Sequence, residues 1–155
     1  MVCYSGAETD LVIPDYITEI YEYAFYWCFS LTSVVIGNSV TTIGYQAFYY
    51  CDSLTSVVIG NSVTSIGEWA FAGCSSLTSV VIGDSVTSIG SDAFYNCSKL
   101  EKVYYKGTAE DWANITIGGW NSSLTNATRY YYSESEPTAA GNWWHYNDQG
   151  EVAVW

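Results

Sequence analysis

The chain has 155 residues, of which 49% are hydrophobic and only 13% are charged, so the composition predicts a packed fold and not intrinsic disorder. Sixteen acidic and four basic side chains give a formal net charge of -12. This balance argues against binding to nucleic acid or anionic lipid, because both need a basic surface. No apolar run approaches the roughly 18 residues that cross a bilayer, so we expect no membrane insertion.

The two ends of the chain differ in charge. The first 98 residues contain nine acids and no base, and the basic residues follow as Lys99, Lys102, Lys106 and Arg129. The opening sequence MVCYSGAETD lacks the charged and apolar regions of a signal peptide. Two interpretations stay open: the protein is made in the cytoplasm, or the chain is a fragment whose export signal lies elsewhere.

A repeat with a period of 23 residues dominates the chain from residue 11 to about 105. The clearest columns are Cys28, Cys51, Cys74 and Cys97; the Ala-Phe pairs that end in Phe25, Phe48, Phe71 and Phe94; and Leu31, Leu54, Leu77 and Leu100. Residues 1–20 hold an incomplete turn, or N-terminal cap, with Leu11, Ile13, Ile17 and Ile20 in equivalent columns. A fixed interval of this size is typical of a solenoid.

One unit can be interpreted from residue types alone. Residues 31–36 are rich in Val, Ile and Thr, which favours a strand, and 37–39 supply a turn. Residues 40–43 predict a second short extended piece. After Gly44, we expect a turn of α-helix or 3-10 helix over 45–50. The apolar area that one coil buries by itself does not offset the conformational entropy lost when its residues become ordered. Stacked coils bury more area, because they cover each other's apolar faces.

We therefore predict an α/β solenoid: a short, right-handed stack of about four coils over residues 21–105, with a parallel sheet on one side. The 23-residue repeat does not continue into residues 106–155. There, Thr108 and Asp111 predict a capping box at the start of a short helix. Residues 129–132 predict a strand, and 142–146 with 151–155 predict a hairpin. Five of the seven tryptophans lie in this region, which is either an aromatic α+β C-terminal cap or a small separate module.

The unit CxxLTSVVIGxSVTxIGxxAF resembles the leucine-rich repeats of the BspA-like bacterial surface proteins, also called the Treponema pallidum type. The similarity covers residues 11 to about 105, and the tail VYYKGTAEDWANITIG resembles the ending of many gut-bacterial members. The resemblance implies a secreted or surface-attached protein that binds other proteins or host matrix. The expected location, extracellular or at the cell surface, comes from this resemblance alone.

The cysteines suggest neither a metal site nor a disulfide. Equivalent side chains of successive coils lie about 4.8 Å apart, so the four thiols form a row and cannot surround one ion. We expect reduced structural cysteines whose S–H groups reach loop carbonyls. Cys3 lies outside the row and is expected to be an exposed or fraying thiol.

No catalytic constellation or cofactor site emerges from the sequence. His145 is the only histidine, and no nucleophile motif accompanies it. Glu101, Glu110 and Asp111 form the nearest acidic cluster, which a solvated face explains better than glycoside cleavage. We therefore expect no enzyme, no cofactor and no metal.

Two candidate surfaces remain for partner binding. The strand face is expected to present Ser33, Val35, Ser56, Val58, Ser79, Val81, Lys102 and Tyr104. The columns that vary between coils flank the Ala-Phe pairs and contain Tyr26, Trp27, Tyr45, Tyr49, Tyr50, Trp69 and Tyr95. Tyr and Trp are enriched at interfaces. Either surface, or neither, is the contact site.

The sequence thus predicts a non-catalytic module for protein binding or adhesion, with host matrix or another surface protein as the partner. A first alternative is glycan binding through Trp120, Trp143 and Trp144. A second is a structural spacer in a longer surface protein. The sequence does not predict an oligomeric state.

Overall fold

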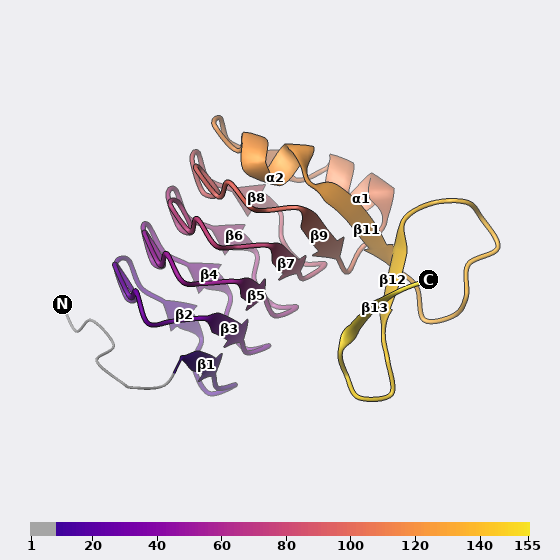
Figure 1. The fold of residues 1–155 in the computed structure, drawn as a ribbon, viewed down its shortest axis with the longest axis horizontal. Helices are drawn as coiled ribbons and strands as arrows, with labels where there is room; N and C mark the ends of the chain where they lie inside the picture. The colour runs from indigo at the N-terminus through magenta and orange to yellow at the C-terminus, as the bar shows by residue number, and fades with distance from the viewer. Residues whose placement is uncertain (1–8) are drawn as a thin grey trace.

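The computed structural model describes residues 9–155, which wind into five stacked coils (Figure 1). Cys3 lies outside the described residues. The first sheet has the order β1-β3-β5-β7-β9-β11-β12-β13, with bounds Asp10–Ile13, Ser33–Ile36, Ser56–Val58, Ser79–Ile82, Lys102–Tyr105, Thr128–Tyr132, Trp143–Tyr146 and Val152–Val154. The second has the order β10-β8-β6-β4-β2, with bounds Thr116–Ile117, Ser88–Ile89, Ser65–Ile66, Thr42–Ile43 and Glu19–Ile20. All pairs are parallel except β12 with β13, which confirms the predicted solenoid with its parallel sheet.

Strand pairing repeats at the interval found in the sequence. Ser33 pairs with Ser56, and Ser56 pairs with Ser79. The same register begins one coil earlier, where Asp10 of β1 pairs with Ser33 and Ile20 of β2 pairs with Ile43. The opening segment therefore adds a strand to both sheets, and the stack has five coils where the sequence suggested about four after an incomplete turn.

The core is a set of columns in which each side chain contacts its equivalent one coil away. The rings of Phe25 and Phe48 stack with centroids 4.9 Å apart, Phe48 and Phe71 follow at 5.1 Å, and Phe71 and Phe94 at 5.2 Å. The last three of these phenylalanines are fully buried. Each coil thus covers the apolar face of its neighbour, as the solenoid interpretation requires.

The segment after the second glycine of each repeat, such as Gly44, is a series of tight turns, so the expected turn of helix is wrong. Residues 45–50 contain Gln46 and Tyr50 with φ of 52° and 54°, and left-handed residues interrupt a helix. Their N–H groups point to the next coil instead. Gln46 donates to the Glu68 carbonyl at 3.0 Å, and Tyr50 donates to the Ala72 carbonyl at 2.8 Å. A helix would keep such bonds within one segment.

Polar side chains repeat the same inter-coil bonding at the corners. Thr55 Oγ1 donates to the Thr32 carbonyl at 2.9 Å, and equivalent threonines one coil away do the same. At Gly60 the coils approach so closely that a Cβ would lie 2.5 Å from the Gly37 carbonyl oxygen. Glycine is therefore required there by close backbone approach.

The C-terminal segment contains two short helices, α1 (Ala109–Ala113) and α2 (Ser122–Asn126). The predicted capping box is present at α1: Thr108 Oγ1 accepts from the Asp111 N–H at 3.1 Å, and Asp111 Oδ2 accepts from the Thr108 N–H at 2.9 Å. The predicted strand is β11, and the predicted hairpin is the antiparallel pair of β12 and β13. Helix α2 and strand β10 were not predicted.

Both sheets continue across residue 105, because β9 pairs with β11 and β8 pairs with β10. Neither sheet ends at residue 105, so the strand pairing does not mark this boundary. The division into 1–20, 21–105 and 106–155 stays a prediction. In the described part of the chain, neither helix has the length and apolar character needed to cross a membrane.

The row of backbone hydrogen bonds that joins the turns of successive coils ends at Asn121. This residue occupies the position that alanine has in earlier coils. Phe71 donates its N–H to the Ala93 carbonyl at 2.8 Å, but Phe94 donates to Asn121 Oδ1 at 2.9 Å. Asn121 Nδ2 also donates to the Gly90 carbonyl at 2.9 Å. A side-chain amide thus replaces the backbone acceptor that the chain no longer supplies when it leaves the stack for α2.

Candidate functional site

The predicted strand face is only partly exposed. Val35 and Lys102 are exposed, whereas Ser33, Ser56, Val58 and Ser79 are half-buried. Val81 and Tyr104 are only 4% and 7% exposed. The expectation that these two side chains point to solvent is therefore wrong.

The C-terminal hairpin covers the part of this face that contains Val81 and Tyr104. Trp144 of β12 is fully buried against Val81 and Tyr104 in a second apolar cluster. Its Nε1 donates to the Tyr105 carbonyl at 2.9 Å, and its ring lies 5.6 Å from that of Tyr104. Tyr130 of β11 stacks on the other side of Tyr104 at 5.3 Å. Residues distant in sequence thus occupy the surface that the repeat pattern left open.

A groove of about 300 Å³ lies between the open strands and the hairpin. Val12, Val35 and Val58 contribute to its floor, and Lys106 and Tyr146 line its far side. Lys106 Nζ lies 5.4 Å from the centre of the Tyr146 ring. Burial lowers the pKa of Lys106 from its usual value. The groove therefore combines an apolar floor with one partly desolvated ammonium group.

The variable columns form a continuous surface on the opposite side of the coils. We call this surface the aromatic edge, and it contains Tyr26, Trp27, Tyr45, Tyr49, Tyr50, Trp69 and Tyr95. Tyr26 and Tyr49 stack in nearly parallel planes at 5.2 Å, and Tyr49 meets Trp69 edge-on at 6.1 Å. Trp69 in turn contacts Tyr95 at 5.7 Å. The rings therefore form a connected array across four coils.

The aromatic edge has an inner and an outer layer. Tyr26, Tyr49 and Trp69 are half-buried. The outer rings are exposed: Trp27 by 49%, Tyr95 by 45%, and Tyr45 and Tyr50 by 37% each. Burial is the largest cause of the raised pKa of Tyr49, so its phenol stays neutral at physiological pH. Large apolar surface held in place by neighbouring rings is suited to contact with another molecule.

Two further rings extend the same surface and were missed by the sequence analysis. Tyr23 is 37% exposed and meets the ring of Tyr45 at 5.5 Å, and Phe29 is 51% exposed and lies 5.7 Å from Trp27. Both belong to the first coil. Alignment of that coil with the later ones by the 23-residue period would have placed Tyr23 in the variable column of Gln46, Trp69 and Asp92, whereas Phe29 lies in a column outside those that flank the Ala-Phe pairs.

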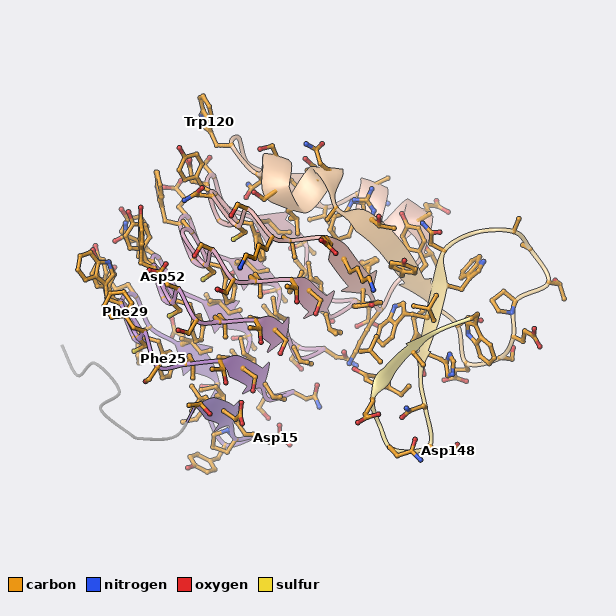
Figure 2. All side chains as sticks on the ribbon, viewed as in Figure 1. Asp15, Phe25, Phe29, Asp52, Trp120 and Asp148 are labelled. Atoms are coloured by element: carbon orange, nitrogen blue, oxygen red, sulfur yellow. The ribbon has the colours of Figure 1, made fainter. Side chains whose placement is uncertain are left out.

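Acidic side chains border the aromatic edge. Glu22 and Glu68 are exposed, and Asp52 and Asp92 are half-buried. Glu22 and Glu68 directly precede Tyr23 and Trp69 in the sequence, and Figure 2 shows Asp52 on the same side of the molecule as Phe29. No lysine or arginine occurs before Lys99, so the first three coils, which contain Glu22, Asp52 and Glu68, have no basic residue.

The cysteine column has the predicted structural role. Cys51 Sγ donates to the Phe25 carbonyl, Cys74 Sγ to Phe48 and Cys97 Sγ to Phe71, at 3.2 to 3.3 Å. Burial raises the pKa of Cys97 to about 12 and that of Cys74 well above its usual value. These thiols therefore stay protonated and are poor nucleophiles. Between residues 9 and 155, no group of three His, Cys, Asp or Glu side chains is arranged to hold a metal ion.

The residues considered for catalysis are scattered. His145 stacks on Trp155 with centroids 3.9 Å apart, and its Nδ1 is buried without a hydrogen-bond partner among the described residues. Asp111 is held by the capping box, and hydrogen bonds from Thr108 lower its pKa. Glu101 and Glu110 are exposed. The structure brings none of these acids together with His145 in a common pocket.

The tryptophans considered for glycan binding lie in three different environments. Trp144 is fully buried, so its proposed role as a glycan platform is wrong. Trp143 is half-buried and donates its Nε1 to the Ala139 carbonyl at 3.1 Å. Trp120 is 75% exposed and projects from the end of the stack (Figure 2).

The repeats match a known family. The model of the BspA type leucine rich repeat region matches residues 2–119 in six copies. A search of curated proteins gives no match.

Three solved structures of bacterial proteins match the chain, and the first of them is similar in fold. A leucine rich cell surface protein from Faecalibacterium prausnitzii is 30% identical with a TM-score of 0.57; the match covers 70% of this chain and 35% of that protein, so the chain spans about a third of its length. A leucine rich repeat protein from T. pallidum is 30% identical with a TM-score of 0.48, covering 76% and 72% of the two chains. A leucine-rich repeat protein from Bacteroides ovatus is 24% identical with a TM-score of 0.47, covering 79% and 37%.

Proposed function

The chain belongs to the BspA-type leucine-rich repeat family, and from that premise we propose that it is a non-catalytic protein-binding module of a bacterial surface or secreted protein. The observation that carries the proposal is the aromatic edge, where outer rings remain 37% to 49% exposed on a rigid stack of coils. Exposed aromatic clusters of this kind mark interaction sites because they bury large apolar area on contact.

The aromatic edge is favoured over the strand face because the protein covers much of the latter itself. Trp144 occupies the outer surface of β7 and β9, and the groove beside it is narrow. The edge has no such cover from the hairpin, which lies on the opposite side of the coils (Figure 1). Its rings also vary from coil to coil, which gives the surface distinct chemistry along its length.

The test is binding to a panel of purified host matrix and bacterial surface proteins, measured by surface plasmon resonance. The double variant Tyr45→Ala with Tyr95→Ala removes two outer rings at positions whose φ is not left-handed. We expect it to lose most of the binding shown by the unmodified protein. Tyr16→Ala is the control, because Tyr16 is 83% exposed and lies in the turn after β1. Equal binding by the double variant would show that the edge is not the contact site.

Glycan binding is the second candidate, and the exposed ring of Trp120 is the observation that favours it. Sugar rings stack on exposed aromatic faces in the same way as other apolar groups. A glycan array probed with the unmodified protein and with Trp120→Ala separates this candidate from protein binding. A structural spacer, the remaining alternative, would retain no ligand in either assay.

A further inference from the structure

We propose that the segment bound by the aromatic edge is cationic and rich in arginine. This inference rests on the proposed function and specifies the chemistry of the partner. It combines two observations from the same side of the molecule: an array of exposed ring faces, and carboxylates in a stretch of the chain that has no lysine or arginine before Lys99.

Rings of neighbouring coils lie close together on this surface. Trp27 and Tyr50 occupy the same column one coil apart, with ring centroids 6.2 Å from each other, and Tyr49 lies beside Tyr50 at 4.6 Å. A guanidinium group is planar and stacks on such faces, whereas a lysine ammonium is a point charge with a tighter hydration shell. Successive arginines of an extended segment could therefore contact successive coils.

The protein already uses this contact within its own fold. Arg129 Cζ lies 4.4 Å from the centre of the Trp112 ring, and Lys106 Nζ lies 5.4 Å from that of Tyr146. Both contacts are in the C-terminal region, where all of the basic residues occur. The N-terminal coils have the rings and no internal cation to place on them.

Charge points to the same partner. Glu22, Asp52, Glu68 and Asp92 border the edge, and the nearest basic residue in the sequence is Lys99, at the end of the fourth coil. A cationic segment would gain both ring contacts and these carboxylates, while an acidic segment would be repelled. The net charge of -12 would also speed the approach of a cation and make the association sensitive to salt.

The experiment uses short synthetic peptides of alternating glycine with arginine, lysine, glutamine or glutamate, titrated against the full chain by fluorescence anisotropy. We expect the arginine peptide to bind more tightly than the lysine peptide, and the glutamine and glutamate peptides not to bind. Tyr45→Ala and Tyr95→Ala should each weaken binding by about two- to fivefold, the effect of one exposed cation–π contact. Tyr45→Phe and Tyr95→Phe should retain it, because they keep the ring.

A chain this acidic attracts any cation, so the charge control decides whether binding is local. Glu68→Gln should weaken binding of the arginine peptide, and Asp148→Asn on the distant hairpin turn should not (Figure 2). Equal effects of the two substitutions, or full binding by the alanine variants, would overturn the inference. Thermal melts of each variant verify that the stack remains folded.

A second measurement separates this inference from the proposed function. A random peptide library is panned against the unmodified protein, and the recovered peptides are tested on the double alanine variant. Recovery of uncharged peptides that need the rings would overturn the cationic partner while leaving protein binding by the edge intact. Recovery of peptides that bind both forms equally would overturn both.

Discussion

At the scale of single residues, positions with a left-handed backbone conformation show how successive coils are hydrogen-bonded along the turns, where there is no β-strand. Tyr23, Gln46, Trp69, Asp92 and Trp120 form one column with φ between 52° and 61°. None is glycine, although such a conformation costs on the order of 1–3 kcal/mol elsewhere. The N–H groups of the first four donate to carbonyls of the next coil, and these hydrogen bonds, repeated along the stack, offset the local strain.

Asn121 allows the first prediction, because its amide satisfies the end of this row of hydrogen bonds. It is only 4% exposed and makes bonds to the Phe94 N–H and to the Gly90 carbonyl. Asn121→Ala leaves the Phe94 N–H buried without a partner and the Gly90 carbonyl with the Ala93 N–H alone, so we expect a loss of about 1–3 kcal/mol in the free energy of unfolding. Urea denaturation followed by circular dichroism measures the change. Asn126→Ala at an exposed site is the control, and an equal loss there would contradict the assigned role.

The second prediction compares an inward-facing position of one coil with an outward-facing position of another. Leu77 is fully buried in the core cluster, whereas Val35 on the strand face is 40% exposed. Leu77→Ala should lower the free energy of unfolding by about 2–5 kcal/mol because it leaves a cavity. Val35→Ala should change it by about 0.5 kcal/mol or less. Thermal melts that ranked the two variants in the other order would contradict the assignment of these faces.

At the scale of elements, the short helix α1 shows how a local motif could be predicted while its surroundings could not. Thr108 and Asp111 stand three residues apart, and that spacing alone is enough for a capping box. The packing of Trp112 from the same helix against Tyr105, at 5.2 Å, needs the position of a strand in the sheet. Sequence spacing therefore predicts the capping box, but it does not predict which residue of the sheet packs against the helix.

The capping box gives the third prediction, through its dependence on pH. Hydrogen bonds from Thr108 lower the pKa of Asp111 below its usual 3.8. A carboxyl group with a lowered pKa stabilises the fold above its unfolded value, and this contribution is lost as the pH falls through the folded value. Asp111→Asn should therefore lower the melting temperature at pH 7, and the difference from the unmodified protein should shrink below about pH 4. Melts at pH 7, 5 and 3 measure it.

A constant difference between the two proteins across this range would show that the charge of Asp111 is unimportant. Asp148→Asn provides the matched control. Asp148 lies exposed in the turn between β12 and β13, and its substitution should leave the melting temperature unchanged at every pH.

At the scale of the whole molecule, the 23-residue period made most of the fold predictable. Once Ser33, Ser56 and Ser79 fall in one column, the parallel pairing and the row of cysteines follow from the stacking of identical units. The conformation of the turns could not be predicted, because Gln46 and Tyr50 are residue types that rarely adopt positive φ. The repeats therefore encode which residues are neighbours more clearly than the backbone angles that join them.

The candidate site was predictable to a similar extent. The rings of the aromatic edge could be grouped because variable columns of a solenoid lie side by side. The burial of Val81 and Tyr104 could not be predicted, since it depends on Trp144, which lies 40 residues beyond Tyr104 and outside the repeat. No periodic pattern indicates where a nonrepeating hairpin will pack.

The last prediction tests the stack as a whole by removing one coil. Threonine hydroxyls donate to carbonyls 23 residues earlier, so deletion of residues 55–77 joins Leu54 to Thr78 in the same register. We expect the shortened protein to keep its circular dichroism spectrum and unfold cooperatively at a lower temperature, because neighbouring coils contribute roughly additive stability. Deletion of residues 55–76 instead shifts the register by one position and turns apolar side chains outward. A folded product from the second deletion would show that coil register does not determine this structure.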